Sequence, residues 1–431
     1  MMARFRTLLI ELRSSLWFLP ALIVFGSCAL AIVVIELDWR LSLKLLQDFP
    51  RLFGAGAEGS RGMLSSIASS MITVASVTFS ITIVALSQAS SQYSSRILRN
   101  FMRDRGNQAV LGVFLGVFSY CLLVLRVIRG GDEGQFVPSL SVFVALILVL
   151  VAISFLIFFI HHVASLLQAS NVIAAAAHET IQTIDRLFPK SFRDNESKEE
   201  PGPESDNRLE QERQIVIPAP KTGYIQTHDN ETFFRLACSS QSVFRMHAAI
   251  GEFVAFDDPL VSVYSSLPLN EKLVKDIQAT YSISSARTIE QDAGFGIRQI
   301  VDIALKALSP GVNDTTTAIT CIDYLTAINR RLANRRIAHA LVFEDSRLRV
   351  IAKGPDFEEF LAESFDQIRA NAGGKAAVIL HLLRSLKTIH AATDDTYRRL
   401  LISRHISLLE DLTSSTIDSA YDAARIRRAL N

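Results

Sequence analysis

The chain has 431 residues and carries 44 lysine and arginine residues against 43 aspartate and glutamate residues, a formal net charge of +1. This balance disfavours a nucleic-acid-binding protein, because such proteins normally show a clear basic excess. Hydrophobic residues make up 49% of the chain, which disfavours both overall disorder and a purely soluble protein. Neither a disulfide framework nor a cysteine zinc site is expected, since the four cysteines lie far apart (Cys28, Cys121, Cys238 and Cys321).

The hydrophobic excess is concentrated in four runs near the N-terminus. They are Trp17–Ile35, Met63–Leu86, Val110–Ile128 and Leu140–Ile160. Each is long enough to approach the ~20 residues that a helix needs to cross ~30 Å of hydrocarbon. In lipid the backbone must satisfy its own hydrogen bonds, so the runs must be helical. The sequence therefore predicts an α-helical membrane protein with four transmembrane helices.

Basic residues near the ends of these runs predict the orientation of the helices. They gather before the first run and in the second loop: Arg4, Arg6 and Arg13, then Arg96, Arg99, Arg103 and Arg105. In the first loop basic and acidic residues balance, and the third loop holds little charge. Because basic loops stay in the cytoplasm, we expect both termini and the second loop to be cytoplasmic.

Changes in composition divide the chain into four regions. Residues 1–188 are expected to form the four-span domain with a helical stalk, because the helical pattern continues past the fourth run. Residues 189–213 are charged and rich in turn residues, which predicts an acidic flexible linker. Short β-branched and aromatic runs predict a β-rich module over 214–266. Residues 267–431 are expected to form a mainly helical cytoplasmic domain with one hairpin, whose helices begin after Asp292, Asp314, Pro355, Gly374 and Asp394.

Two sequence segments in the β-rich region are similar to segments of a known cofactor-carrying module. APKTGYIQ and GEFVAFDDPLVSV resemble the two halves of a biotinyl- or lipoyl-like barrel-sandwich domain. The lysine hairpin that carries the cofactor in that family has no counterpart here, and Lys221 falls in the turn before a strand. The resemblance therefore implies a structural module without an attached cofactor.

The second hydrophobic run contains an unusual row of hydroxyl side chains. Written as a heptad, its a and d positions are Ser66, Ser69, Thr73, Ser76, Ser80, Ile83, Ser87 and Ser90, of which the first seven are the candidate pore-lining row. One interpretation is close helix packing, because small residues let helices approach each other. The other is a pore wall assembled from several copies, in which Ile83 is either a packing residue or a hydrophobic constriction.

The segment Gln92–Asn107 predicts an amphipathic helix. Tyr93, Ile97 and Phe101 fall on one side, while the arginines fall largely elsewhere. We expect Arg96, Arg99, Arg103 and Arg105 to contact anionic lipid at the cytoplasmic surface. The alternative is a soluble helix packed on the C-terminal region.

The densest group of polar residues in the C-terminal region lies between Glu290 and Asp314. Arg298 and Asp302 are four residues apart on an expected helix and can form an ion pair. Asn313 or Asp314 follows a Ser-Pro-Gly turn and can begin the next helix. One interpretation is a structural corner whose polar groups bond each other. The other is an anion or ligand site of Arg298, Asp302, Asn313 and Asp314 at two neighbouring helix N-termini.

The chain resembles the widespread bacterial family of predicted inner-membrane proteins catalogued as domain of unknown function 2254. The resemblance covers most of the chain and is carried by separate motifs: Ser69–Ala75, Phe79–Thr82, Ser91–Ser94, Arg99–Phe101, Arg103-Asp104, His161-His162, Gly294–Gln299 and Ala307–Gly311. It implies a multi-pass protein of the bacterial inner membrane.

Together these patterns favour a homo-oligomeric channel or transporter-like protein with a cytoplasmic regulatory domain. The alternative is a membrane-anchored sensor or scaffold whose cytoplasmic domain binds a ligand or partner. We do not expect an enzyme, because no serine or cysteine stands in a nucleophile context such as G-x-S-x-G. No cofactor is expected, and no metal either, since no carboxylate lies near His161 and His162 in the sequence.

Overall fold

The computed structural model describes residues 17–48, 56–92, 104–129, 136–166, 168–188, 213–266, 268–337, 341–345 and 347–430. The chain divides into two compact units, residues 1–171 and 172–431. Each unit is described by itself. The predicted linker at 189–213 lies outside the described residues, apart from Arg213 at its end.

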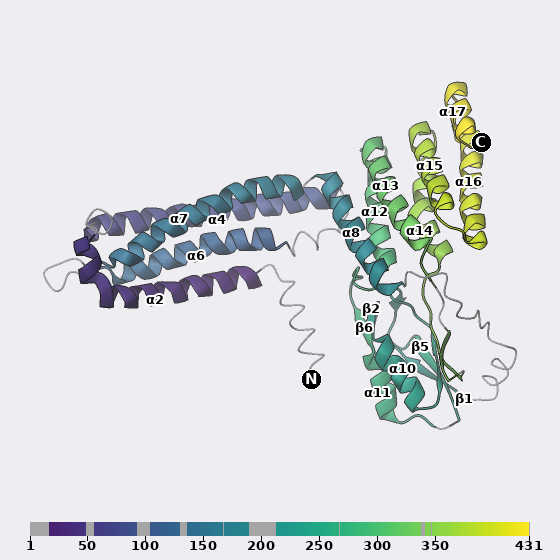
Figure 1. The fold of residues 1–431 in the computed structure, drawn as a ribbon, viewed down its shortest axis with the longest axis horizontal. Helices are drawn as coiled ribbons and strands as arrows, with labels where there is room; N and C mark the ends of the chain where they lie inside the picture. Colours follow the sequence, from purple (N-terminus) through teal and green to yellow (C-terminus); the bar gives the residue numbers. More distant parts are fainter. Residues whose placement is uncertain are drawn as a thin grey trace. The chain divides into compact units, whose positions relative to one another are not determined.

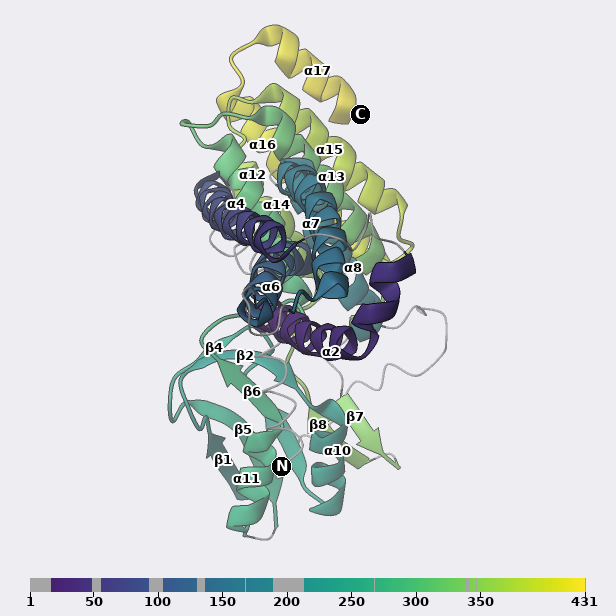
Figure 2. The ribbon, with the colours of Figure 1, turned by 90° about the vertical axis from the view of Figure 1, so that its left-hand side faces the viewer.

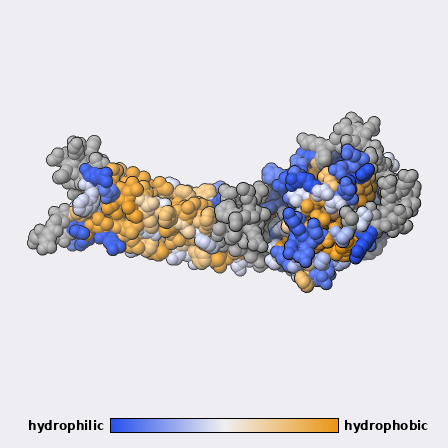
Figure 3. Space-filling view, turned by 90° about the horizontal axis from the view of Figure 1, so that it is seen from below, coloured by the Kyte–Doolittle hydropathy of each residue, from blue (hydrophilic) through white to orange (hydrophobic). Residues whose placement is uncertain are grey.

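The described part of the first unit contains four long helices, seen side by side in Figure 1 and end on in Figure 2. They are α2 (Phe18–Asp48), α4 (Ala57–Gln92), α6 (Arg105–Val127) and α7 (Ser139–Leu166). Among the described residues, each of the four has the length and hydrophobicity of a membrane span, as the four runs predicted. Hydrophobic residues cover most of the face of this unit drawn in Figure 3, with hydrophilic residues gathered at one end.

Helix α6 contacts all three other helices of the unit. Its closest approach is to α2, where a Cβ built on Gly112 would lie 2.7 Å from Ile23 Cδ1 and 3.0 Å from Pro20 Cα. One turn later, a Cβ on Gly116 would lie 2.5 Å from Ser27 Oγ. The pair thus forms a G-x-x-x-G contact of the kind that lets membrane helices pack backbone to backbone.

A buried carboxylate on α2 caps the start of α7. Asp38 is only 1% exposed and accepts hydrogen bonds from the Leu140 N–H (3.0 Å), the Ser141 N–H (2.8 Å) and the Ser141 hydroxyl (2.6 Å). A helix N-terminus attracts negative charge because its first N–H groups have no partner within the helix. Asp38 therefore joins two spans that are distant in sequence.

The second unit contains two sheets. One has the strand order β1-β5-β3-β8-β7 and the other the order β4-β2-β6. The strands are β1 (Arg213–Pro218), β2 (Gly223–His228), β3 (Val243–Met246), β4 (Phe253–Val254), β5 (Pro259–Ser265), β6 (Tyr281–Ser284), β7 (Leu341–Glu344) and β8 (Arg347–Ile351). All pairs are antiparallel except β3 and β8, in which Phe244 lies opposite Val350.

The β region is more mixed than the sequence predicts. Helix α10 (Asn230–Ser239) interrupts the expected run of strands, and its Phe233 lies in the core between the strands. Strands β6, β7 and β8 join the two sheets from beyond the expected boundary at residue 266. The structure thus shows a mixed sheet region, and it does not confirm the detail of a barrel-sandwich. Lys221 does lie in the bend before β2, and β7 and β8 form the predicted hairpin.

The expected continuous stalk is instead two helices. Helix α7 ends at Leu166 and α8 (Ala169–Leu187) begins after a short interruption. Helix α8 is packed against α12 (Ala293–Leu308). Thr180 on α8 is buried, and a Cβ built on Gly296 of α12 would lie 2.0 Å from the Thr180 hydroxyl oxygen. Asp185 forms ion pairs with Arg331 (2.7 Å) on α13 (Thr315–Leu332) and with Arg335 in the turn that follows this helix.

Helices make up the rest of the second unit: α11 (Glu271–Ala279), α12 (Ala293–Leu308), α13 (Thr315–Leu332), α14 (Phe357–Ala370), α15 (Ala376–Ala391), α16 (Thr396–Thr416) and α17 (Ala420–Leu430). The starts of α12 to α16 confirm the prediction to within one residue. Asp292, Asp314 and Asp356 accept from the N–H groups of Phe295, Thr317 and Glu359 at 2.8–3.0 Å. Asp395 caps α16 in the same way.

Candidate functional site

The row of hydroxyls on α4 lies on the outside of the four-helix unit. The residues of the predicted row are all exposed: Ser66, Ser69, Thr73, Ser76, Ser80, Ile83 and Ser87. The opposite side of α4 packs on its neighbours through Leu64, Ala68, Met71, Ala75 and Thr78. At about 100° per residue, the hydroxyl face and the packed face point in nearly opposite directions. The row therefore does not pack against the described helices of its own protomer.

Several hydroxyl groups of this face donate their hydrogen to backbone carbonyls of α4 itself. Ser66, Thr73 and Ser76 donate to the carbonyl oxygens of Gly62, Ser69 and Ile72 at 2.8–2.9 Å. Such bonds to the preceding turn satisfy the donor and leave oxygen lone pairs directed outward. The result is a weakly polar strip on the least hydrophobic of the four spans.

The predicted lipid-contacting segment falls mostly outside the described residues. Arg96, Arg99 and Arg103 belong to that part of the chain. Arg105 is described and is exposed at the first position of α6.

Arg298 lies on α12 and is already paired with carboxylates. Its Nε is 2.9 Å from Asp302 Oδ1, and its Nη1 is 3.4 Å from Glu363 on α14. The side chain is 21% exposed. An incoming anion would have to compete with two carboxylates for this guanidinium, so the observed contacts are those of the structural interpretation.

Asn313 and Asp314 are exposed at the other end of α12. Ten residues separate Arg298 from the last residue of α12, about 15 Å at the helical rise per residue. Asp314 accepts from the Thr317 hydroxyl (2.6 Å) and N–H (3.0 Å), and these bonds hold the pKa of Asp314 below its usual value. Asn313 adopts a left-handed conformation (φ 47°) in the turn. The structure does not bring the four predicted ligand-binding residues together.

An Asp–His pair in the membrane unit was not predicted. Asp104 Oδ2 lies 2.6 Å from His162 Nε2 on α7, and Asp104 also caps α6 by accepting from Gly106 and Asn107. The Phe158 ring stacks on His162. A Cβ on Gly106 would come within 2.7 Å of His162 Nε2, so glycine permits the contact. Asp104 and His162 both lie in motifs that carry the family resemblance, but their separation of 58 residues conceals the pair.

No metal site follows from this pair. Among the described residues, no group of three histidine, cysteine or acidic side chains could hold an ion. The pair instead ties the beginning of α6 to the end of α7 at one end of the bundle.

Comparisons with known proteins agree with this architecture. A family model described as a predicted membrane protein (DUF2254) matches residues 13–388. The chain is 30% identical to uncharacterised proteins of Mycobacterium bovis and Mycobacterium tuberculosis over 420 residues, 95% of this chain and 78% of each relative. No solved structure gives a significant match.

Proposed function

The chain belongs to the DUF2254 family of predicted membrane proteins, and we propose that it is a homo-oligomeric channel or transporter-like protein whose copies meet along the hydroxyl face of α4. The single observation that carries this proposal is the outward direction of that face. A lone protomer would expose the strip to lipid tails, which cannot hydrogen-bond to the hydroxyl oxygens. In an oligomer the same strip would line a shared axis and contact water.

The chemistry of the strip favours passage rather than tight binding. Hydroxyl oxygens are weak polar groups and carry no net charge, so they can replace part of a solute's hydration without holding it. Ile83 and Phe79, both exposed, provide apolar positions on the same outer side. A ring of such residues would form a hydrophobic constriction of the kind that gates by dewetting.

We place the protein in the bacterial inner membrane with both termini and the second unit in the cytoplasm, and assign the second unit a regulatory role. The arginine-rich segments before α2 and between α4 and α6 support this orientation. Free cysteines in the second unit, Cys238 and Cys321, suit a reducing compartment.

Flux through reconstituted protein tests the proposal. Thr73→Val and Ser80→Ala remove hydroxyls from the strip and should lower ion or solute flux into liposomes by about two- to fivefold, the effect of losing one weak hydrogen bond. Ser154→Ala is the matched control, because Ser154 is exposed on α7 and donates to the Leu150 carbonyl (3.1 Å) in the same manner.

Two results would contradict the proposal. One is a flux that the strip variants and the control variant change equally. The other is the absence of flux in wild-type liposomes, which would leave the alternative of a membrane-anchored sensor or scaffold.

A further inference from the structure

A cavity of about 400 Å³ opens in the membrane unit, among side chains of α2, α4, α6 and α7. Its walls are almost wholly apolar and include Val24, Leu86, Leu111, Leu115 and Val163. This volume falls within the range of small-molecule sites, which are usually apolar with a few polar groups that fix orientation. None of the hydroxyl residues of the outward strip lines the cavity, although Ile83 and Phe79, the apolar residues beside the strip, do.

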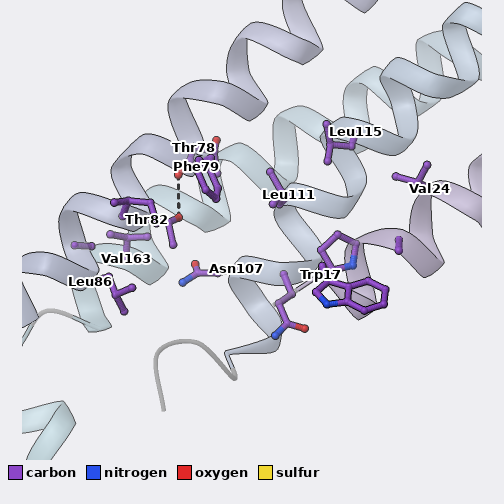
Figure 4. Close-up of a pocket in the computed structure, with 15 residues that line it drawn as sticks. Trp17, Val24, Thr78, Phe79, Thr82, Leu86, Asn107, Leu111, Leu115 and Val163 are labelled. Atoms are coloured by element: carbon purple, nitrogen blue, oxygen red, sulfur yellow. Dashed lines mark hydrogen bonds between the residues drawn. The ribbon is translucent and has the colours of Figure 1, made fainter. Parts of the chain in front are cut away.

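One polar group in the cavity wall lacks a partner. Asn107 is 8% exposed, and no donor among the described residues lies within hydrogen-bond distance of its buried Oδ1. Figure 4 shows its side chain extending toward Thr82, Val163 and Leu86. Buried amide oxygens are normally hydrogen-bonded, so a bound molecule that donates a hydrogen bond would complete this site.

Thr82, another polar side chain in the same view, shows the contrast. The Thr82 hydroxyl donates to the Thr78 carbonyl at 2.8 Å, marked by the dashed line in Figure 4. Its donor is therefore satisfied within α4, whereas Asn107 Oδ1, buried in the cavity wall, has no hydrogen-bond partner among the described residues.

We propose that this cavity binds a single-chain lipid alcohol, with the chain against the apolar walls and the terminal hydroxyl donating to Asn107 Oδ1. None of the described residues that line the cavity is charged, which disfavours phosphate or carboxylate headgroups. A carboxylate would also present oxygen to oxygen at Asn107. The site lies within membrane-spanning helices, so an apolar ligand can reach it from the bilayer.

Trp17 provides a reporter for binding, because it lines the cavity. The chain has two tryptophans, and the other, Trp39, packs against Phe136 away from the cavity. In the full-length Trp39→Phe protein in detergent, ω-bromododecanol should quench Trp17 fluorescence saturably. Its methyl ether, which cannot donate a hydrogen bond, should need about tenfold more probe for half-saturation, the worth of one net hydrogen bond.

Two variants assign the preference to one atom. Asn107→Leu should bind alcohol and ether equally, at about the affinity of the ether for the parent protein. Thr82→Val removes the hydroxyl oxygen of Thr82, a second possible acceptor, from the same cavity and should keep the preference for the alcohol, because the proposal assigns the hydrogen bond to Asn107.

The comparison of alcohol with ether in the parent protein stands even if Asn107→Leu fails to fold. Equal half-saturation of the two probes would overturn the proposal and indicate simple partitioning of apolar chains. Quenching that never saturates would also overturn the proposal. So would a folded Asn107→Leu protein that still binds the alcohol more tightly than the ether.

Discussion

His228 is a buried histidine at the end of β2, between the rings of Phe233 (4.7 Å between centroids) and Tyr281 (4.3 Å). Burial lowers its pKa below the usual value of 6.5, because the surrounding rings cannot solvate an imidazolium. As the pH falls through 6.5, the unfolded chain takes up a proton at this residue before the folded chain does. The free energy of unfolding of the second unit should therefore decrease as the pH is lowered, by up to about 1.4 kcal/mol per pH unit.

Hydrogen exchange of the β2 and β6 amides between about pH 7.5 and pH 5 measures this effect, after correction for intrinsic exchange. His228→Gln should flatten the dependence. His178→Gln, at an exposed position on α8, should leave it unchanged. A slope that is the same in all three proteins would place the titrating group elsewhere.

Asp38 offers a second test at a single residue. Asp38→Asn keeps the size of the side chain but replaces one acceptor oxygen with an NH₂ group that cannot accept from the start of α7. We expect the free energy of unfolding of the helical bundle to fall by about 1–3 kcal/mol. Glu36→Gln is the control, because Glu36 forms an exposed ion pair with Arg40 (2.8 Å). This substitution should lower the free energy of unfolding by less than about 1 kcal/mol.

Denaturation in mixed detergent micelles measures the free energy of unfolding of both variants. Equal losses for Asp38→Asn and Glu36→Gln would mean that the buried cap adds nothing beyond a surface charge.

The difference between these aspartates and those of the second unit shows what sequence can predict at this scale. Asp292 and Asp314 accept hydrogen bonds from N–H groups three residues later in the chain, so a local sequence pattern predicts these helix starts. Asp38, in contrast, bonds to Leu140 and Ser141, which are 102 and 103 positions away in the sequence. Asp104 bonds to His162, which is 58 positions away. Only the fold brings such pairs together, and the Asp104–His162 pair accordingly escaped prediction.

At the level of elements, the contact of α2 with α6 depends on the absence of side chains. A Cβ at Gly112 would meet Ile23 and the backbone of Pro20, so Gly112→Ala should force the helices apart and lower the unfolding free energy by about 1–3 kcal/mol. Gly62→Ala on α4 meets nothing within 4 Å and should be neutral or stabilising by up to about 1 kcal/mol. Denaturation of both variants in micelles checks the prediction, and a Gly112→Ala protein as stable as Gly62→Ala would refute it.

Element types were predicted well where periodicity is long and poorly where strands are short. The four spans and the helices from α12 to α16 follow from hydrophobic patterns over many residues. Strand β6 has four residues and owes its place to pairing with β2, which is distant in sequence. The break between α7 and α8 was missed because residues near 167 carry no glycine or proline to mark it. The packing of Thr180 on Gly296 shows why α8 belongs with the second unit, and no local signal contains that contact.

At the scale of the whole molecule, the proposed function depends on what covers the outward face of α4. The heptad pattern predicted the strip itself, because one helix determines which residues share a face. It could not predict the direction of the strip, because that depends on which side α6 covers. The buried face through Ala68 and Ala75 settles this direction within one protomer. The strip therefore contacts either lipid or another copy of the chain.

Cross-linking distinguishes these two environments. In a chain whose four native cysteines are replaced, Thr73→Cys and Ser80→Cys should form disulfide-linked dimers in native membranes upon mild oxidation, because copies that meet along the strip bring equivalent positions together. Ser154→Cys places a thiol on the exposed side of α7 at a comparable membrane depth and should remain monomeric. Equal cross-linking at all three positions would indicate random collision in the bilayer. Monomers at Thr73 and Ser80, together with a monomeric protein in detergent, would show that lipid covers the strip, and the proposal of conduction along it would then be wrong.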